Sequence, residues 1–332
     1  MKKQGRYKAL ALLSGGLDSI LAIRLIQDQG IDVQAVTFVS PFFNDRKARE
    51  AARALHVKVI TIDITDKIIK TLEKPKYGFG KNLNPCIDCH LLMVRETVAL
   101  LKKLRADFII TGEVVGERPK SQNYQALKTI ETESGIKGKL LRPLSAKRLD
   151  PTEMELKGIV KRDKLEGITG KSRTRQIELA GKLGIKTYPA PAGGCLLTVP
   201  RFADRLRENL RRGLLKNKEL EMLKYGRHFL TGKNNRVIIG RWEDENSIIF
   251  DLADDLFYIM DLKEAPGPVT VLETSEPDND EILKVASLTA RYSKSRNKKK
   301  VLIRYYQKKD PAREREVEVR PRDFKTVGFT LL

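Results

Sequence analysis

Residues 14–19 read Ser-Gly-Gly-Leu-Asp-Ser. It follows an apolar run over 9–13 and leads into a second apolar run over 20–26, which predicts a strand, a glycine-rich turn and a helix in that order. Two glycines let the backbone approach an anion, two hydroxyls can donate to it, and the helix starts with free N–H groups at the positive end of its dipole. The stretch therefore predicts a phosphate-binding loop.

Two common phosphate-binding motifs are excluded at this loop. It lacks the Gly-x-x-x-x-Gly-Lys-Ser/Thr pattern of a Walker A loop and the Gly-x-Gly-x-x-Gly pattern of a dinucleotide site. An ordinary glycine-rich turn is the alternative. The strand before the loop and the helix after it favour phosphate binding.

Strands and helices alternate after this loop. We expect strands at 33–39, 57–62, 108–112 and 140–144, and helices at 45–55 and 91–104. This alternation predicts an α/β fold with a doubly wound parallel sheet. Because ligands bind at the carboxyl edge of such sheets, the loop at 14–19, the turn at 111–113 and the segment at 84–90 are expected to converge there.

The chain changes character after about residue 180. A stretch rich in Pro and Gly occupies 181–194, a basic helical region covers 201–223, and short strands are expected at 236–240, 247–250 and 269–272. We therefore predict a catalytic domain over 1–200, a basic helical linker over 201–230 and a smaller α+β domain over 231–332.

The charge balance points to a polyanionic partner. The 332 residues include 64 Lys and Arg against 43 Asp and Glu, a formal net charge of +21. Residues 290–309 hold nine basic side chains and no acidic one, with tyrosines between them, which suits phosphate neutralisation and base stacking. A solvated face is the alternative for this run. Trp242 is expected in the core rather than as a platform for a base.

Membrane association is not expected. The sequence has no apolar run of 18 residues, no signal-peptide core at the N-terminus and no clear basic amphipathic helix with bulky apolar residues opposite. We therefore expect a cytoplasmic protein with nucleic acid, and no membrane, as its partner.

The three cysteines are Cys86, Cys89 and Cys195. Three thiols cannot all pair within one chain, so we do not expect a disulfide scaffold. Cys86 and Cys89 form a C-x-x-C pair just before a predicted helix, whose dipole favours the thiolate form. We favour a [4Fe-4S] cluster held by all three cysteines, with one iron left open to carry hydrosulfide.

Other chemistry for these thiols stays open. A catalytic thiol with a persulfide partner is one alternative, and simple buried cysteines are another. A zinc site would take His90 as its fourth ligand, although the adjacency of His90 to Cys89 is unfavourable for a tetrahedron.

The first 200 residues resemble the catalytic domain of tRNA 4-thiouridine synthases of the ThiI type, which are PP-loop ATP pyrophosphatases with an adenine nucleotide α-hydrolase-like fold. The resemblance rests on the loop 14–19, the cysteine pair at 86–89, Thr-Gly-Glu-Val-Val-Gly at 111–116 followed by Ser-Gln at 121–122, and Leu-Arg-Pro-Leu at 141–144. It implies ATP-dependent adenylation of a uridine carbonyl in tRNA and replacement of its oxygen by sulfur. Enzymes that make 2-thiouridine share the loop and paired cysteines, so a tRNA 2-thiouridylase is an alternative.

The C-terminal third resembles another family. Residues 239–246, 266–269 and 290–296 are similar to the NFACT-R module of ribosome-quality-control proteins, which is associated with RNA binding. The usual Pro-Gly-Ser-His of that module is Pro-Gly-Pro-Val here. ThiI-type proteins carry an N-terminal THUMP region, and some carry a rhodanese domain that delivers persulfide. This sequence begins at the catalytic strand and has no fourth cysteine, so we expect the C-terminal module to hold RNA.

The resemblance implies a set of site residues. We expect the catalytic residues to be Cys86, Cys89, Cys195 and Asp18, with Asp18 orienting the loop or a Mg²⁺ ion. The same three cysteines would bind the cluster. The expected ATP ligands are Ser14, Gly15, Gly16, Asp18, Ser19, Thr37, Gly112, Glu113 and Gln122. The expected partners are tRNA, ATP and a sulfide or persulfide donor, and a homodimer is left open.

Two further functions remain as alternatives. A PP-loop enzyme that transfers nitrogen, or sulfur to a small molecule, would keep the adenylation chemistry without needing a basic RNA-binding module. A non-enzymatic RNA-binding protein with a decayed nucleotide fold is the other. The intact loop and the three thiols argue against that second alternative.

Overall fold

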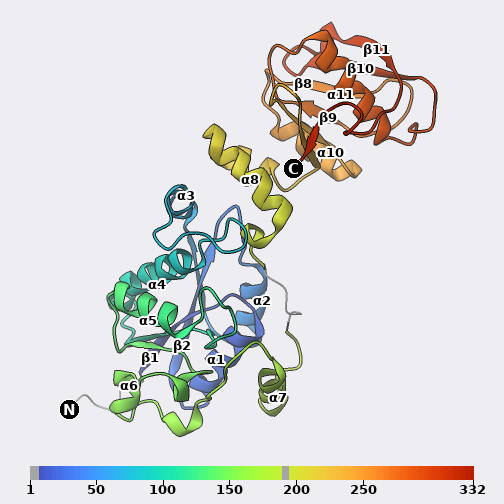
Figure 1. Cartoon of the computed structure of the whole chain (residues 1–332). Helices are drawn as coiled ribbons and strands as arrows, with labels where there is room; N and C mark the ends of the chain where they lie inside the picture. Colours follow the sequence, from blue (N-terminus) through green and yellow to red (C-terminus); the bar gives the residue numbers. More distant parts are fainter. Residues whose placement is uncertain (1–6, 189–193) are drawn as a thin grey trace. The chain divides into compact units, whose positions relative to one another are not determined.

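The computed structural model describes residues 7–188 and 194–332, and the chain clusters into two compact units, Met1–Thr198 and Val199–Leu332 (Figure 1). Each unit has its own sheet and its own core. None of the helices in the described part of the chain is both long and apolar enough to cross a membrane.

The first unit is built on a five-stranded sheet in the order β3-β2-β1-β4-β5. All four neighbouring pairs are parallel, which confirms the predicted α/β class. The strand order reverses at β1, so the crevice between the carboxyl ends of β1 and β4 is the topological switch point where ligands bind in such sheets. Its strands are β1 (Lys8–Leu12), β2 (Asp32–Val39), β3 (Val59–Asp63), β4 (Phe108–Ile110) and β5 (Leu140–Leu141).

Helices cover both faces of this sheet. Ala9 and Ala11 of β1 pack with α1 and α2 on one face, whereas Leu10 packs with α4 and α5 on the other, because successive strand side chains point to opposite sides (Figure 1). The sheet is therefore doubly wound, as predicted. The helices are α1 (Leu17–Gln27), α2 (Arg46–Ala54), α3 (Thr65–Glu73), α4 (Cys86–Lys103), α5 (Tyr124–Glu133), α6 (Glu153–Leu156) and α7 (Thr174–Lys182).

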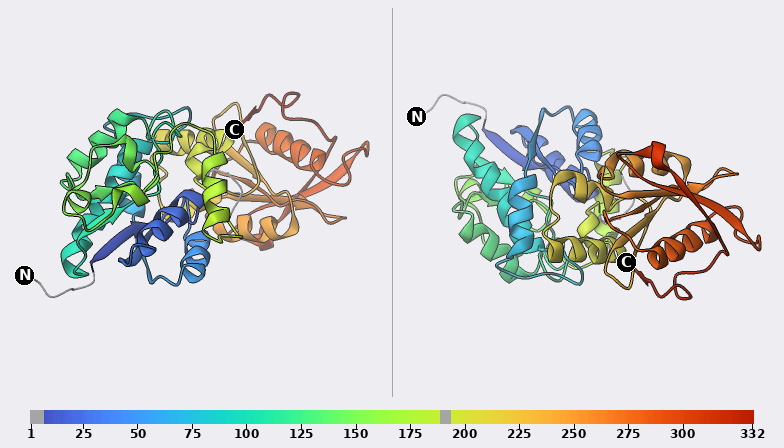
Figure 2. Two further views of the ribbon diagram at one scale, coloured as in Figure 1. Left: turned by 90° about the horizontal axis from the view of Figure 1, so that it is seen from below. Right: turned by 90° about the horizontal axis from the view of Figure 1, so that it is seen from above.

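The second unit contains an antiparallel sheet in the order β11-β10-β8-β9-β7-β6-β12. Val285 and Leu288 of α11 pack on one face of it, and Ile249 of α10 packs with Ile238 and Val271 on the other. Figure 2 shows the ribbon from two further directions. The elements are α8 (Pro200–Arg212), α9 (Asn217–Met222), β6 (Arg227–Leu230), β7 (Arg236–Ile239), α10 (Glu243–Leu252), β8 (Tyr258–Leu262), β9 (Thr270–Leu272), α11 (Asn279–Arg291), β10 (Val301–Gln307), β11 (Arg315–Val319) and β12 (Thr330–Leu331).

Two local expectations are wrong in this unit, and the helical region expected at 201–223 is present. The strand expected at 247–250 lies inside α10, whose first turn carries Glu243, Asp244 and Glu245 at the positive end of the helix dipole. Trp242 precedes that helix and is 68% exposed, so it is not a core residue. The basic region 201–223 is two helices, because the chain turns at Gly213 with a φ of +69°.

Gly112 allows the close approach on which the sheet edge depends. A Cβ at this position would lie 2.5 Å from the backbone nitrogen of Ser19 and 2.6 Å from the carbonyl carbon of Asp18. We expect Gly112→Ala to lower the free energy of unfolding by about 1–3 kcal/mol, because the first turn of α1 must move. Thermal or urea unfolding of the purified protein measures this loss.

Gly181→Ala is the matched control. Gly181 lies in α7 and a Cβ there meets nothing within 4 Å, so alanine should leave stability unchanged or raise it by about 0.5–1 kcal/mol. Equal stability of the two variants would contradict the assigned contact between Gly112 and α1.

Candidate nucleotide and thiol site

The loop between β1 and α1 is held by its own hydroxyls. Ser19 Oγ donates to the carbonyl of Gly16 at 2.8 Å, and Ser14 Oγ accepts from the Gly16 N–H at 3.3 Å. Gly15 has a φ of +78°, and a Cβ there would lie 2.4 Å from the backbone of Lys47. The loop is therefore a tight backbone turn at the start of a helix, which is the geometry that anion binding needs.

Two other expected nucleotide ligands line the same edge. Thr37 is buried in β2, and the neighbouring Val36 carbonyl accepts from the N–H of Leu13, the residue before the loop, at 2.9 Å. Gln122 is also buried, and its Oε1 has no hydrogen-bond partner in the described part of the chain. Its backbone carbonyl closes the turn after β4 by accepting from Gly116 N at 2.7 Å.

Glu113 is a buried carboxylate with three protein partners. Its Oε1 lies 2.8 Å from Nδ1 of His90, and its Oε2 accepts from Nε of Arg142 at 2.9 Å and from Oγ1 of Thr111 at 3.0 Å. Burial raises the pKa of Glu113, but Arg142 and His90 outweigh it and bring that pKa down to about 2. Both carboxylate oxygens are thus engaged in joining α4, the turn after β4 and the end of β5.

The C-x-x-C pair forms the first turn of α4 instead of preceding it. Helix α4 begins at Cys86, so Cys86 and Cys89 lie one turn apart on the same face. Asn84 Nδ2 donates to Cys86 Sγ at 3.1 Å. The Asp88 carboxylate accepts from the backbone N–H groups of Lys76 and Tyr77 at 2.9 and 3.0 Å, which fixes the preceding loop.

Cys195 reaches this region from far along the chain. The N–H of Leu196 donates to the carbonyl of Phe42 at 3.0 Å, and Asn82 Nδ2 donates to the carbonyl of Thr198 at 2.7 Å. These contacts place 195–198 beside the loop after β2 and the loop before α4. Residues 189–193, which the sequence predicts to be a rigid loop, lie outside the described residues.

The three thiols influence one another. Burial raises the pKa of Cys89, and the negative charges of Cys195 and Cys86 raise it further. Burial also raises the pKa of Cys195, to about 11, with a further contribution from Cys86. The expectation that the helix dipole favours the thiolate is wrong for Cys89, because burial and the other thiols act in the opposite direction and are stronger.

This donor set suits a ligand that brings positive charge. Cys86, Cys89 and Cys195 are all partly buried, and the raised pKa values of Cys89 and Cys195 would fall if a metal centre supplied compensating positive charge. Among residues 7–188 and 194–332, no group of three or more His, Cys, Asp or Glu side chains, the three cysteines included, is arranged so that it could hold a metal ion.

Arg118 connects the loop to the thiols. Its positive charge lowers the pKa of Asp18 and also that of Cys195, although burial raises both. Asp18 Oδ1 is buried and has no hydrogen-bond partner among the described residues. Arg118 therefore lies within electrostatic range of both Asp18 and Cys195.

Sequence reasoning misses two residues next to Asp18. Arg173 and Gln176 counteract the rise in the Asp18 pKa that burial causes. The sequence marks Arg173 only as part of a cationic surface over 171–175, and it does not point to Gln176. No local pattern marks them as site residues, because α7 carries charged and polar residues at most positions around them.

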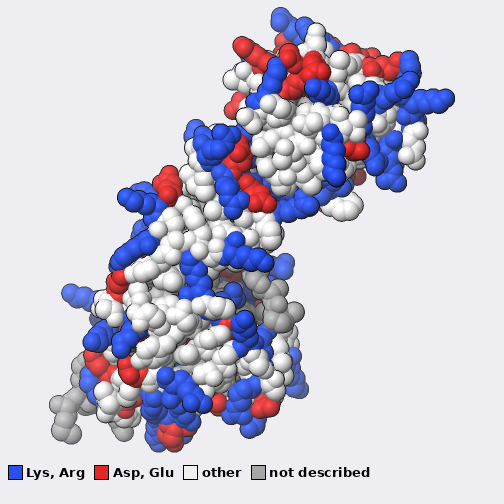
Figure 3. Space-filling view, in the orientation of Figure 1, with Lys and Arg blue, Asp and Glu red and all other residues white. Residues whose placement is uncertain are grey.

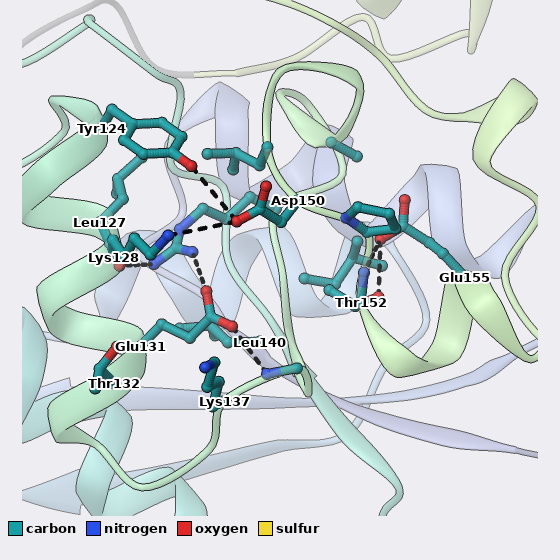
Figure 4. A pocket seen from close by; sticks show the side chains of 16 residues that line it. Tyr124, Leu127, Lys128, Glu131, Thr132, Lys137, Leu140, Asp150, Thr152 and Glu155 are labelled. Carbon is teal, nitrogen blue, oxygen red and sulfur yellow. Dashed lines mark hydrogen bonds and ion pairs between the residues drawn. The ribbon is translucent and has the colours of Figure 1, made fainter.

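A separate cavity of about 210 Å³ lies between α5 and the segment 149–155 (Figure 4). Its polar side chains are paired with one another: Lys128 Nζ lies 3.6 Å from Asp150, Arg142 Nη1 lies 3.6 Å from Glu131, and Thr152 Oγ1 donates to Glu155 at 2.8 Å. None of its polar atoms is among the buried, unpartnered atoms of the described chain, so it is a poorer candidate for a ligand site.

Comparison with known proteins matches two family models to this chain. Residues 4–151 match the model described as thiamine biosynthesis protein (ThiI), and residues 226–326 match the model described as NFACT protein RNA binding domain. The two models match separate parts of the chain. Both resemblances expected from the sequence are thereby confirmed.

Curated relatives match the ThiI-type domain in part. A probable tRNA sulfurtransferase of Geobacillus kaustophilus (strain HTA426) is 31% identical over 141 residues, 41% of this chain and 34% of that protein. The tRNA-specific 2-thiouridylase MnmA of Sulfurimonas denitrificans (strain ATCC 33889 / DSM 1251) is 30% identical over 118 residues, 32% of this chain and 35% of that protein. The chain thus spans about a third of the length of these relatives.

One solved structure with a similar chain is the crystal structure of a 4-thiouridine synthetase–RNA complex with bound ATP. It has a TM-score of 0.40 and 20% sequence identity, and the match covers 65% of this chain and 52% of that one.

We expect Glu113→Gln to lower the free energy of unfolding by about 3–5 kcal/mol at neutral pH, because Arg142, which is 2% exposed, loses its buried counter-charge. The folded pKa of Glu113 lies below its ordinary value of 4.5, so its stabilisation is present above pH 4.5 and is lost as the pH falls toward about 2. The difference between wild type and variant should therefore shrink in acid. Urea unfolding over a pH series measures it.

Glu133→Gln is the control, because Glu133 pairs with Lys76 near the surface and should cost much less. A constant difference between wild type and Glu113→Gln from neutral to acid pH would contradict the assigned ion pair.

Proposed function

We propose that this protein is an ATP-dependent tRNA sulfurtransferase, with 4-thiouridine the favoured product and with AMP and pyrophosphate released. The observation that carries the proposal is a tight glycine turn after β1, together with hydrogen bonds that hold residues 195–198 against the loop after β2 and the loop that leads to Cys86 and Cys89. A site that holds a nucleotide beside three thiols suits a reaction in which one activated carbon loses oxygen and gains sulfur. The ThiI-type match over 4–151 supports the same chemistry.

The first step activates the base. The phosphates of ATP would be held by the backbone of Gly15 and Gly16 and by the hydroxyls of Ser14 and Ser19. Asp18 would orient the loop or a Mg²⁺ ion. The uridine carbonyl oxygen attacks the α-phosphorus, the bond to the bridging oxygen breaks, and pyrophosphate leaves. The base must leave its stack for this in-line attack.

The second step exchanges the oxygen for sulfur. Sulfide attacks the adenylated carbon, and the carbon–oxygen bond breaks so that AMP leaves with the original carbonyl oxygen. Cys86, Cys89 and Cys195 would hold a [4Fe-4S] cluster, which would supply an open iron for hydrosulfide that an external sulfide donor provides. His90, held by Glu113, fixes the first turn of α4 and with it the positions of Cys86 and Cys89.

The NFACT-type unit is proposed to bind tRNA. Lys294, Arg296, Lys298 and Lys299 are exposed and have no ion pair among the described residues, whereas Lys300 and Arg304 of the same run pair with Glu318 and Asp261. Figure 3 shows Lys and Arg side chains on the visible face of both units. The exposed side chain of Trp242 adds a surface on which a base can stack.

Replacing Cys195 by alanine should abolish tRNA thiolation and leave Mg²⁺-ATP binding within about twofold of wild type, because the phosphate loop does not include this residue. Mass spectrometry of nucleosides from tRNA of a deletion strain carrying each variant measures the product. Cys195→Ser is the matched variant, since it keeps the side-chain shape and removes the thiolate. Retained thiolation in the alanine variant would contradict the proposal.

The same nucleoside spectra separate the two ring positions. Loss of 4-thiouridine with 2-thiouridine intact in the deletion strain is the expected result. The reverse pattern would assign the 2-thiouridylase reaction, to which the similarity with MnmA also points. Intact levels of both would leave a small-molecule substrate, and a protein that releases no AMP with tRNA and sulfide would be an RNA-binding protein without this activity.

The exposed cations should determine the salt dependence of tRNA binding. Lys298→Gln/Lys299→Gln should reduce the slope of log affinity against log salt by about 0.7–0.9 for each phosphate that the variant no longer neutralises. Lys263→Gln/Lys300→Gln removes the same charge from cations that pair with Glu314, Glu316 and Glu318, so its slope should stay near that of wild type. Equal slopes for both double variants would show that the basic run is an ordinary solvated face.

A further inference from the structure

Buried polar atoms without partners gather beside the phosphate loop. The described residues contain eight buried side-chain nitrogen or oxygen atoms with no hydrogen-bond partner, and five of them belong to Asp18, Gln122, Arg173 and Gln176. Gln176 is fully buried, and both of its amide atoms are in this group. Each such atom costs free energy, so a cluster of them at one edge of the sheet indicates a site that a polar ligand completes.

The fold brings these side chains together from three distant segments. Leu17 and Leu21 of α1 share a core with Val114 of the turn after β4 and Leu179 of α7. The N–H of Gly170 donates to the carbonyl of Val115 at 2.8 Å, which ties the segment before α7 to the same turn. The beginning of α7 is thus held against Asp18 by packing and by a backbone hydrogen bond.

The charges in this cluster are mixed. Burial raises the pKa of Asp18, and Arg173 and Arg118 counteract that rise. Burial also raises the pKa of Glu117, and Asp18 raises it further, while the same two arginines oppose the change. Two carboxyl groups and two guanidinium groups therefore act on one another here, and the side chain of Gln176 acts on one of those carboxyl groups, that of Asp18.

A phosphate chain with a bound divalent cation matches this mixture. Carboxylates are the ligands that Mg²⁺ takes from a protein, guanidinium groups bind phosphate oxygens, and an amide can donate to phosphate or accept from metal-bound water. We propose that Arg173 and Gln176, with Arg118 and Glu117, form the second half of the phosphate site and bind the Mg²⁺-bound β- and γ-phosphates of ATP.

This inference rests on the proposed function and adds to it the residues that recognise the leaving group. The loop at 14–19 surrounds the phosphates with backbone and hydroxyl groups, whereas the beginning of α7 supplies a full positive charge. The bond that breaks during adenylation leaves negative charge on pyrophosphate, and Arg173 is placed to stabilise it.

Calorimetric titration of the full-length protein with Mg²⁺-ATP, Mg²⁺-pyrophosphate and AMP tests the assignment. Arg173→Gln should weaken binding of the first two ligands about tenfold or more, because each loses a charge-assisted hydrogen bond, and should change AMP affinity less than about twofold. Lys171→Gln is the matched control, since Lys171 is an exposed cation two residues away and its loss should leave all three affinities near wild type.

Gln176→Met separates ligand binding from a structural role. Methionine has a similar shape and removes the unpartnered amide, so the melting temperature should rise by about 2–4 °C while Mg²⁺-ATP affinity falls about tenfold. A side chain that only supported the fold would lower both stability and affinity. A lower melting temperature, or unchanged affinity, in this variant would overturn the inference.

The failures of the two proposals are distinguishable. Wild-type protein that binds Mg²⁺-ATP and thiolates tRNA, together with an Arg173→Gln variant of equal affinity for pyrophosphate, would overturn this inference alone. Equal weakening of AMP and pyrophosphate would also overturn it, because AMP lacks the phosphates in question. Wild-type protein that binds neither ATP nor pyrophosphate would overturn the proposed function and this inference with it.

Discussion

The buried carboxylate of Glu113 is the constraint on which the site depends. It contacts His90 at the first turn of α4, Arg142 after β5 and Thr111 at the end of β4. Burying a carboxylate and a guanidinium is expensive unless both are paired and hydrogen-bonded, and these contacts meet that requirement. Because Cys86 and Cys89 lie within four residues of His90 at the start of α4, the contact between His90 and Glu113 helps to fix the position of two thiols.

Both the thiol set and the phosphate loop contain groups that burial makes electrostatically unfavourable. At the thiol set, burial raises the pKa values of Cys89 and Cys195. At the phosphate loop, burial raises the pKa of Asp18, and Gln176 has unpartnered amide atoms. A rigid sheet edge holds these groups in place, so the free energy of ligand binding offsets the cost of leaving them unpartnered.

The parallel sheet could be predicted because its signals are local. An apolar strand, a glycine turn and an apolar helix follow one another at 9–26, and the same alternation repeats along the first unit. The helix at 243–252 could not be predicted from Ser-Ile-Ile-Phe at 247–250, since a short apolar run fits a strand or a buried helix equally well. Acidic residues in its first turn and the packing of Ile249 against Ile238 decide for the helix.

The ligand-binding role proposed for the beginning of α7 could not be predicted from the sequence either, because it depends on packing between distant segments. Residues 171–176 read Lys-Ser-Arg-Thr-Arg-Gln, which is typical of an exposed, basic helix start. Gln176 is fully buried only because Leu179, one turn later, packs against the apolar face of α1. Local hydrophobic periodicity does not show that a segment far away in the sequence buries a polar side chain.

The cationic side chains of the second unit have two different roles. Three cations of the basic run form ion pairs within this unit: Lys300 with Glu318, Arg304 with Asp261, and Lys308 with Asp255. These cations therefore stabilise the sheet and its turns. The exposed cations over 294–299 remain available for phosphates, and phosphate contacts carry no sequence information. Under the proposed function, the NFACT-type unit therefore supplies affinity for tRNA. Selection of the uridine then falls to the sheet edge of the first unit, where the base must fit between the phosphate loop and the thiols.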